Sequence, residues 1–189
     1  MVDAKLWQED GPLFEWWKEM HGLKGASLAA LEPVEPKPGM RGQRAELKRA
    51  GSSGEAVCGA VAYHRLRWAA AQYGVSSYDE DRLVAVARVL AHVKDVAKAD
   101  NGVVQHSFAR LLASPKTEGR PVASELRFKR LLRIDSDREA LTEALVRLLA
   151  LANHQADPLT LAKSIWWWNE NTRRTWANDY YQTLLDSNY

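Results

Sequence analysis

The sequence predicts an all-α protein, a compact helical bundle of two packed lobes. In several segments apolar residues recur three or four positions apart, which is the spacing of one helix face. No segment alternates apolar and polar residues between turn signals on both sides, so we expect no strand. Breakers rich in Gly, Pro and Asn separate the helical segments. One of them, Asp100-Asn101-Gly102, divides the chain into a lobe of residues 1–100 and a lobe of residues 101–189.

The first lobe holds four predicted helices. Residues 13–20 form a short aromatic helix, and a loop rich in proline follows over residues 32–40. Residues 44–50 form a short basic helix. Residues 55–73 form a longer helix that ends before Gly74, since glycine is common just beyond a helix C-terminus. Residues 79–98 form a helix with one apolar face, made up of Leu83, Val86, Ala87, Leu90, Val93 and Ala97.

The second lobe also consists of helices. A short helix over residues 104–113 precedes a loop over 114–121 and a compact basic helix over 124–133. Ser136, with Glu139 three residues later, predicts a capping box at the start of a helix over 137–153. Asp157 followed by Pro158 has the pattern of an N-cap with proline at the first helical position, and starts a helix that runs to Trp168. Residues 172–185 form the last helix.

Composition excludes several classes of protein. Of the 189 residues, 46% are apolar and 26% charged, which is typical of a globular chain. No apolar run approaches the roughly 18 residues that span a bilayer, and the N-terminus lacks a signal-peptide pattern. The single cysteine, Cys58, excludes an intrachain disulfide and is expected to be a buried structural thiol. Membrane, secreted and disulfide-scaffold classes are therefore excluded, and we expect a reducing, cytoplasmic location.

Catalytic and metal-binding patterns are not found in the sequence. The five histidines are scattered without the spacing of a zinc site, and neither a phosphate-binding glycine loop nor a GxSxG motif is present. Asp135 and Asp137 could pair at a metal ion, but they lie at a helix N-terminus, where negative charge is favourable. We expect no enzyme activity, no metal and no cofactor. A nuclease that uses Asp135, Asp137 or His106 stays open as an alternative.

The distribution of charge is more informative than its net value of +2. On a helical wheel of the segment 124–133, drawn at about 100° per residue, Lys129, Arg130 and Arg133 fall within an arc about 100° wide. Phe128, Leu131 and Leu132 fall on the opposite side, with Arg127 flanking. One face can therefore be buried while the other offers cations to phosphates. The basic residues between positions 110 and 133 are Arg110, Lys116, Arg120, Arg127, Lys129, Arg130 and Arg133.

A second basic cluster follows the proline loop. It contains Arg41, Arg44, Lys48 and Arg49, opposed only by Glu46. A third group is the pair Arg173-Arg174, which either bridges to acids or meets an external partner. A single charged helix face is usually just exposed to solvent. Because basic clusters recur along this chain, a binding function for these residues is favoured.

The chain also has an unusual load of eight tryptophans. Trp166, Trp167 and Trp168 point in three different directions on a helix, and the spacing of Trp168 from Leu161 and Ile165 places it in the core. Trp176 and Tyr180 are likewise expected in the core. We expect any exposed tryptophan to contact another protein rather than stack on bases.

The C-terminal third has a specific pattern. It contains the segment Arg127-Phe128-Lys129-Arg130-Leu131-Leu132-Arg133-Ile134-Asp135, a Leu-rich helix, Leu161-Ala162 before Trp166-Trp167, and Arg173-Arg174-Thr175-Trp176-Ala177-Asn178-Asp179-Tyr180-Tyr181. In order and spacing this resembles the CasB family, the small subunit of the type I-E CRISPR Cascade complex. Earlier segments fit as well, including the opening Leu13-Phe14-Glu15-Trp16-Trp17 and the basic turn from Arg44 to Ala50.

The resemblance implies an all-α, non-catalytic subunit of Cascade that takes part in antiviral defence. Two copies of it would lie along the complex and hold the strands that open when guide RNA pairs with target DNA. The implied partners are other Cascade subunits, guide RNA, target DNA and a second copy of the chain, without a membrane. The alternative is a helical adaptor that docks acidic subunits and does not contact nucleic acid. The predicted contacts to the nucleic-acid backbone are Arg44, Lys48, Arg49, Arg110, Lys116, Arg120, Arg127, Lys129, Arg130 and Arg133.

Overall fold

The computed structural model describes residues 2–98, 102–116 and 119–187. Within these ranges it confirms the all-α prediction, and none of the helices is long and apolar enough to cross a membrane. Three short 3-10 helices, η1 (Ala4–Trp7), η2 (Leu28–Ala30) and η3 (Ser77–Asp79), accompany the α-helices. The α-helices are α1 (Pro12–His21), α2 (Met40–Arg49), α3 (Ser53–Gly59), α4 (Val61–Ala71), α5 (Glu80–Leu90), α6 (Phe108–Ala113), α7 (Glu125–Leu132), α8 (Arg138–Leu151), α9 (Pro158–Trp166) and α10 (Glu170–Ser187).

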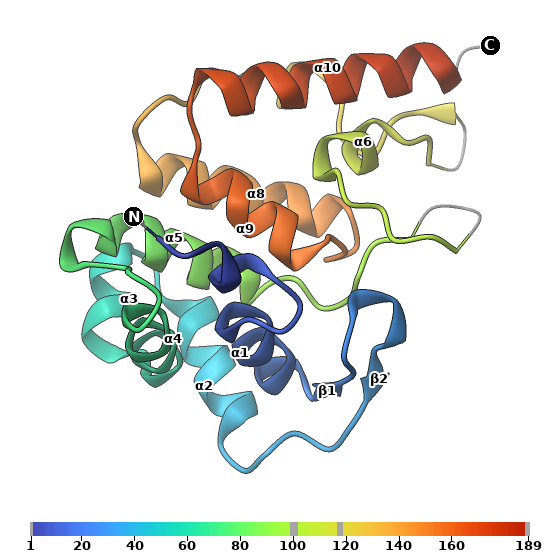
Figure 1. Ribbon diagram of the computed structural model, residues 1–189. Coiled ribbons are helices and arrows are strands. Elements are labelled where there is room, and N and C mark those ends of the chain that lie inside the picture. The colour runs from blue at the N-terminus through green and yellow to red at the C-terminus, as the bar shows by residue number, and fades with distance from the viewer. Residues whose placement is uncertain (1, 99–101, 117–118, 188–189) are drawn as a thin grey trace.

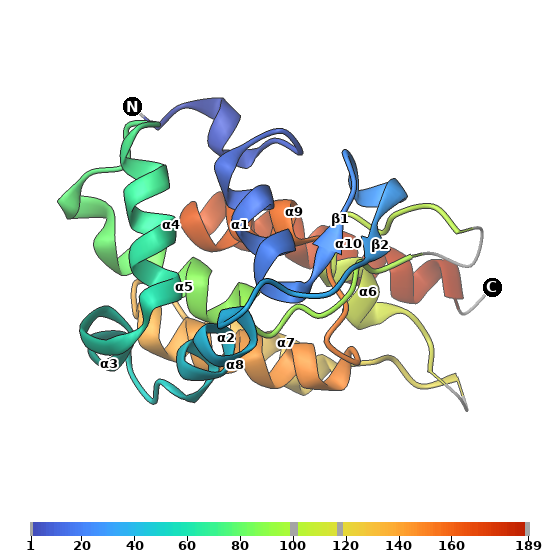
Figure 2. The ribbon, with the colours of Figure 1, turned by 90° about the horizontal axis from the view of Figure 1, so that it is seen from below.

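The helices pack in layers. In Figure 1, α10 lies at the top above α8 and α9, and α1 to α4 lie at the bottom. Helix α5 is buried along residues 83–90 and packs against both α8 and α9. Figure 2 shows the same arrangement from below, with α7 beside α8.

The buried apolar side chains form one core cluster that draws on both halves of the chain. The expected boundary residues Asp100 and Asn101 lie outside the described residues. The division into lobes 1–100 and 101–189 stays a prediction.

A small antiparallel sheet departs from the expectation of no strand. Strands β1 (Leu23–Lys24) and β2 (Glu32–Pro33) pair directly after α1, and two residues are too few to show an alternating pattern. Gly22 permits this turn, because its φ is +64° and a Cβ atom there would lie 2.7 Å from Pro36 Cγ.

Several predicted helices are shorter in the structure than the sequence suggested: the one expected over 104–113 begins at Phe108, and the one expected to run to Trp168 ends at Trp166. The helix expected over residues 55–73 is divided into α3 and α4 by Ala60, which has φ −90° and ψ 104°. The helix expected over 79–98 ends at Leu90. Beyond it, Lys94 N–H donates to the His154 carbonyl at 2.8 Å and Asp95 pairs with Gln155. This backbone pairing with a distant segment replaces the helical turns that the apolar spacing predicted.

The predicted capping box of α8 is wrong. The N-cap is Asp137, whose side chain accepts from Ala140 N–H at 2.9 Å. Glu139 does not turn back to Ser136, because its carboxylate is held by Arg88 of α5.

Helix α9 begins as predicted, with the Asp157 carboxylate accepting from the backbone of the first turn. Trp168 and Trp176 are buried, as expected, and their rings meet edge to face at 5.2 Å. Trp166 is buried too, whereas Trp167 is 45% exposed. Of the three adjacent tryptophans, Trp166 and Trp168 therefore lie in the core and Trp167 lies at the surface.

Cys58 is exposed, which corrects the expectation of a buried thiol. Helix α3 is short and buries only Ala56, so Cys58, two positions along, faces away from the core.

Candidate nucleic-acid interface

Helix α7 presents the basic face that the wheel predicted. Phe128 and Leu131 are buried. The Phe128 ring stacks on Tyr180 of α10 with centroids 3.9 Å apart, and the Tyr180 hydroxyl donates to the Ala123 carbonyl at 2.6 Å. This stack fixes α7 on the bundle, so that its opposite face is turned outward.

The four cations of α7 and its C-cap are exposed but not equivalent. Lys129 pairs with Glu125 at 2.7 Å, and this contact raises the pKa of Lys129 and lowers that of Glu125. Within the described chain, the side chains of Arg127, Arg130 and Arg133 form no ion pair or hydrogen bond. Three guanidinium groups are therefore free to meet an external anion.

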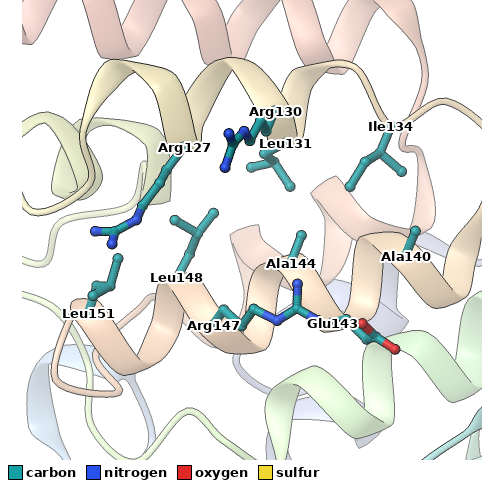
Figure 3. A pocket seen from close by; sticks show the side chains of 10 residues that line it. All are labelled: Arg127, Arg130, Leu131, Ile134, Ala140, Glu143, Ala144, Arg147, Leu148 and Leu151. Carbon is teal, nitrogen blue, oxygen red and sulfur yellow. Dashed lines mark hydrogen bonds and ion pairs between the residues drawn. The ribbon is translucent and has the colours of Figure 1, made fainter.

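A groove of about 490 Å³ runs between α7 and α8. In Figure 3, Arg127 extends from α7 across the groove toward Leu151, and Arg130 lies along the same rim. On the opposite rim Arg147 pairs with Glu143 at 2.6 Å. The floor is apolar and consists of Leu131, Ile134, Ala140, Ala144, Leu148 and Leu151. An elongated polyanion with an apolar component, such as a nucleic-acid strand, matches this lining chemically.

Three other predicted contacts surround α6 and the loop after it. Arg110 is tied to Asp179 of α10 at 3.2 Å, so part of its charge is neutralised internally. Lys116 donates to the Leu151 carbonyl at 2.5 Å, which places its ammonium group at the end of the groove. Arg120 is exposed, and its side chain forms no ion pair or hydrogen bond in the described chain.

Helix α2 carries the second basic cluster. Arg41 and Arg49 are exposed, while Arg44 and Lys48 are half-buried. None of the four forms an ion pair with a described carboxylate, although Glu46 lies on the same helix. Burial and the charge of Arg41 lower the pKa of Arg44. Burial and the charges of Lys94 and Arg44 lower the pKa of Lys48. The fold thus holds like charges together with no carboxylate of the described residues paired to them.

Successive contacts link the α2 cluster to the α7 face. Lys48 lies within electrostatic range of Lys94, and the Lys94 backbone bonds to His154, which follows α8. Near the end of α8, the Leu151 carbonyl accepts a hydrogen bond from Lys116, and Leu151 lines the groove beside Arg127. Sequence reasoning did not find Lys94 or His154, because nothing in the local pattern brings residues 94 and 154 together.

The remaining candidates have internal partners. Arg173 pairs with Asp135 at 3.0 Å and Arg174 with Glu170 at 2.6 Å, so this pair bridges to acids. Asp137 caps α8, and His106 binds Asp157 at 2.7 Å. Among the described residues no group of three or more His, Cys, Asp or Glu side chains could hold a metal ion.

The family model of CRISPR-associated protein Cse2 matches residues 43–181, which is most of the chain. The chain belongs to the Cse2 family. Its fold is similar to that of a chain in the crystal structure of E. coli Cascade bound to a PAM-containing dsDNA target, with a TM-score of 0.62 and 20% identity. The similarity covers 92% of this chain and 96% of that chain. None of the curated proteins matches the sequence.

The Cse2 match confirms the resemblance to CasB, which is the same family under another name. The matched range contains all ten predicted contacts, from Arg44 to Arg133. It also contains Lys94 and His154, which join the two basic regions.

Proposed function

We propose that this chain is a non-catalytic small subunit of a type I-E CRISPR Cascade complex, acting in antiviral defence. Its role is to hold the phosphate backbone of the strands in the R-loop. Its partners are other Cascade subunits, guide RNA, target DNA and a second copy of the chain. Family membership supports the assignment, as does the fold shared with a chain of a DNA-bound Cascade structure.

The observation that carries the proposal is the set of cations without carboxylate partners. Within the described chain, arginine side chains free of ion pairs line one groove and one helix face, and a second cluster whose cations have no carboxylate partner adjoins them through Lys94 and His154. The predicted contact residues are Arg44, Lys48, Arg49, Arg110, Lys116, Arg120, Arg127, Lys129, Arg130 and Arg133. Arg110 and Lys129 contribute less, because each already has an acidic neighbour.

The mechanism follows from the energetics of strand exchange. Pairing of a guide with its target replaces one duplex by another of similar stability, so additional contacts to the backbone tip the balance toward the open R-loop. A subunit that binds phosphates need not read bases, because the guide reads the sequence. Lys and Arg side chains supply such contacts, and their strength falls steeply with salt.

The non-catalytic assignment has a local basis. The acids that could have served a nuclease are used within the fold: Asp137 caps α8, Asp135 binds Arg173, and Asp157 caps α9. A metal-dependent cleavage that disappears in Asp135→Ala would contradict this assignment.

A protein adaptor that does not contact nucleic acid is the second candidate. Its support is the exposure of Trp68, 74%, and of Trp167, since large exposed aromatic residues are enriched at protein interfaces. Binding of free single strands that falls steeply with salt would argue against this adaptor.

The test of the proposed function is co-expression of this chain with the Cascade backbone proteins and a guide RNA, followed by purification through a tag on another subunit. The stoichiometry of the chain is recorded, and target-DNA affinity is compared with and without it. We expect co-purification, and an R-loop that is weakened by removal of the chain while guide binding persists. A chain that stays outside the assembly would overturn the proposal.

A further inference from the structure

Three histidines and three cations gather where α2, the segment after α5 and the segment after α8 meet. His154 is joined to Lys94 by a backbone hydrogen bond, and the charges of Lys48 and Lys94 act on both His92 and His154. These side chains come from four distant parts of the chain. The six residues are His21, Arg44, Lys48, His92, Lys94 and His154.

One of the histidines has a structural task. His21 Nε2–H donates to the Leu90 carbonyl at 3.3 Å, and its Nδ1 accepts from Arg44 Nη1 at 2.9 Å. Both ring nitrogens are therefore occupied in the neutral form. His21 orients Arg44 and is not available to a ligand.

The other two histidines are less fully occupied: among the described residues His92 forms no side-chain hydrogen bond, and the His154 ring bonds only to the His92 backbone. The rings of His92 and His154 stack with centroids 6.3 Å apart. His154 Nδ1 is buried without a hydrogen-bond partner in the described chain. Asn153 and His154 both have positive φ, 54° and 62°, a backbone conformation that costs energy in residues other than glycine. The fold thus maintains a strained turn that holds an imidazole with one unpaired nitrogen beside a lysine.

Among the described residues no carboxylate forms an ion pair with the three cations of this cluster. The carboxylate of Asp95 accepts from Val96 N–H at 2.8 Å, and Glu139 is held by Arg88. Burial lowers the pKa of His92, and the charges of Lys48, His154, Arg88 and Lys94 act in the same direction, so that together they bring it to about 4. Burial and the charges of Lys94 and Lys48 also lower the pKa of His154. An anion bound here would raise the pKa of both histidines, because it favours their protonated form.

We propose that Lys48, Lys94, His92 and His154 form a phosphodiester-binding site whose histidine pair takes up a proton from the solvent when a nucleic-acid strand binds. This inference rests on the proposed function and adds three residues to its phosphate contacts. The two lysines supply permanent charge. The bound phosphate stabilises an imidazolium cation, which then donates a hydrogen bond to a phosphate oxygen. Backbone binding by this chain therefore strengthens as the pH falls.

The test uses the assembled complex and its target DNA. Target affinity is measured at about pH 7.5 and about pH 6 with the wild-type chain, with a His92→Gln/His154→Gln variant and without the chain. We expect the wild-type complex to gain several-fold more affinity at the lower pH than the complex that lacks the chain. The double variant should lose this extra gain. His64→Gln is the matched control and should keep it, because exposed His64 bonds to the Val57 carbonyl and packs on Tyr63, and so does not belong to the cluster.

The outcomes separate the inference from the function on which it rests. If removal of the chain leaves target affinity unchanged at both pH values, the proposed function and this inference both fail. If removal weakens binding but the double variant matches wild type, only the inference fails. Lys94→Gln provides an independent check, since its exposed side chain should not affect folding. It should weaken target binding at both pH values and reduce the pH-dependent gain, and unchanged binding would overturn the inference.

Discussion

Arg88 of α5 and Glu139 of α8 form an ion pair that joins the two halves of the chain, with Nη1 and Oε1 2.5 Å apart. The second oxygen of Glu139 accepts from the backbone N–H and the hydroxyl of Ser53 at 3.0 and 2.7 Å. Arg88 also donates to the Ala50 carbonyl at 3.2 Å. Partial burial raises the pKa of Glu139, but the bonds from Arg88 and Ser53 outweigh it, and the net pKa is lowered.

Removing this carboxylate should destabilise the protein. Glu139→Ala leaves the buried Arg88 guanidinium without its counter-ion, and we expect a loss of about 2 kcal/mol in the free energy of unfolding. Urea denaturation at neutral pH measures this loss in the free energy of unfolding. Glu143→Ala, on the same helix, removes an exposed pair with Arg147 and should cost less than about 0.5 kcal/mol. Equal losses in the two variants would contradict the structural role of the Arg88 pair.

The stability of the protein should fall as the pH falls below neutral. Burial and then the charge of Arg44 lower the pKa of His21 to about 3. The unfolded chain, with a histidine pKa of about 6.5, therefore binds more protons than the folded one below that pH. Between about pH 7 and about pH 5 we expect His21 to account for a loss of roughly 1 to 2 kcal/mol in unfolding free energy. His21→Gln should flatten this part of the profile, and an unchanged slope would contradict the neutral, buried state of His21.

Trp68 should matter for assembly and not for folding. It is 74% exposed on α4 between two hollows, one of about 650 Å³ beside α1 and one of about 400 Å³ beside η3. Trp68→Ser should change the unfolding free energy by less than about 0.5 kcal/mol and lower the amount of chain recovered with tagged Cascade subunits. Trp168→Ala is the contrasting variant, since removal of a buried tryptophan costs about 3 kcal/mol or more.

A second readout decides what Trp68 contacts. If recovery with the tagged subunits is normal and binding of single strands falls instead, Trp68 stacks on bases and the assignment to a protein contact is wrong.

The sequence predicted elements that depend on local signals. The α7 amphipathic pattern, the Asp157 cap and the buried Trp176 depend on residues within one or two turns, and the structure has them as expected. The end of α5 could not be predicted in this way. It depends on hydrogen bonds from the segment after Leu90 to the segment around His154, which is far away in sequence.

The candidate interface was predictable only in part. The sequence located the cations of the interface but not their ion-pair partners. Arg110 pairs with Asp179, for example, and these two residues lie on helices that are far apart in the sequence. The pair of Lys129 with Glu125 follows the i, i+4 rule and was accessible from the sequence. The cluster of His92 and His154 arises from tertiary packing alone, and no local spacing signals it.

The most direct test of the account is the salt dependence of target-DNA affinity. If Arg130 and Arg133 each bind a phosphate, Arg130→Ala/Arg133→Ala should weaken binding to all target sequences alike. It should also reduce the slope of log affinity against log salt by about 1.4, since each single-strand phosphate contact contributes about 0.7. Arg174→Ala, which removes an exposed arginine already paired with Glu170, should leave the slope unchanged. A slope that stays the same in the double variant would show that the α7 face does not bind phosphate.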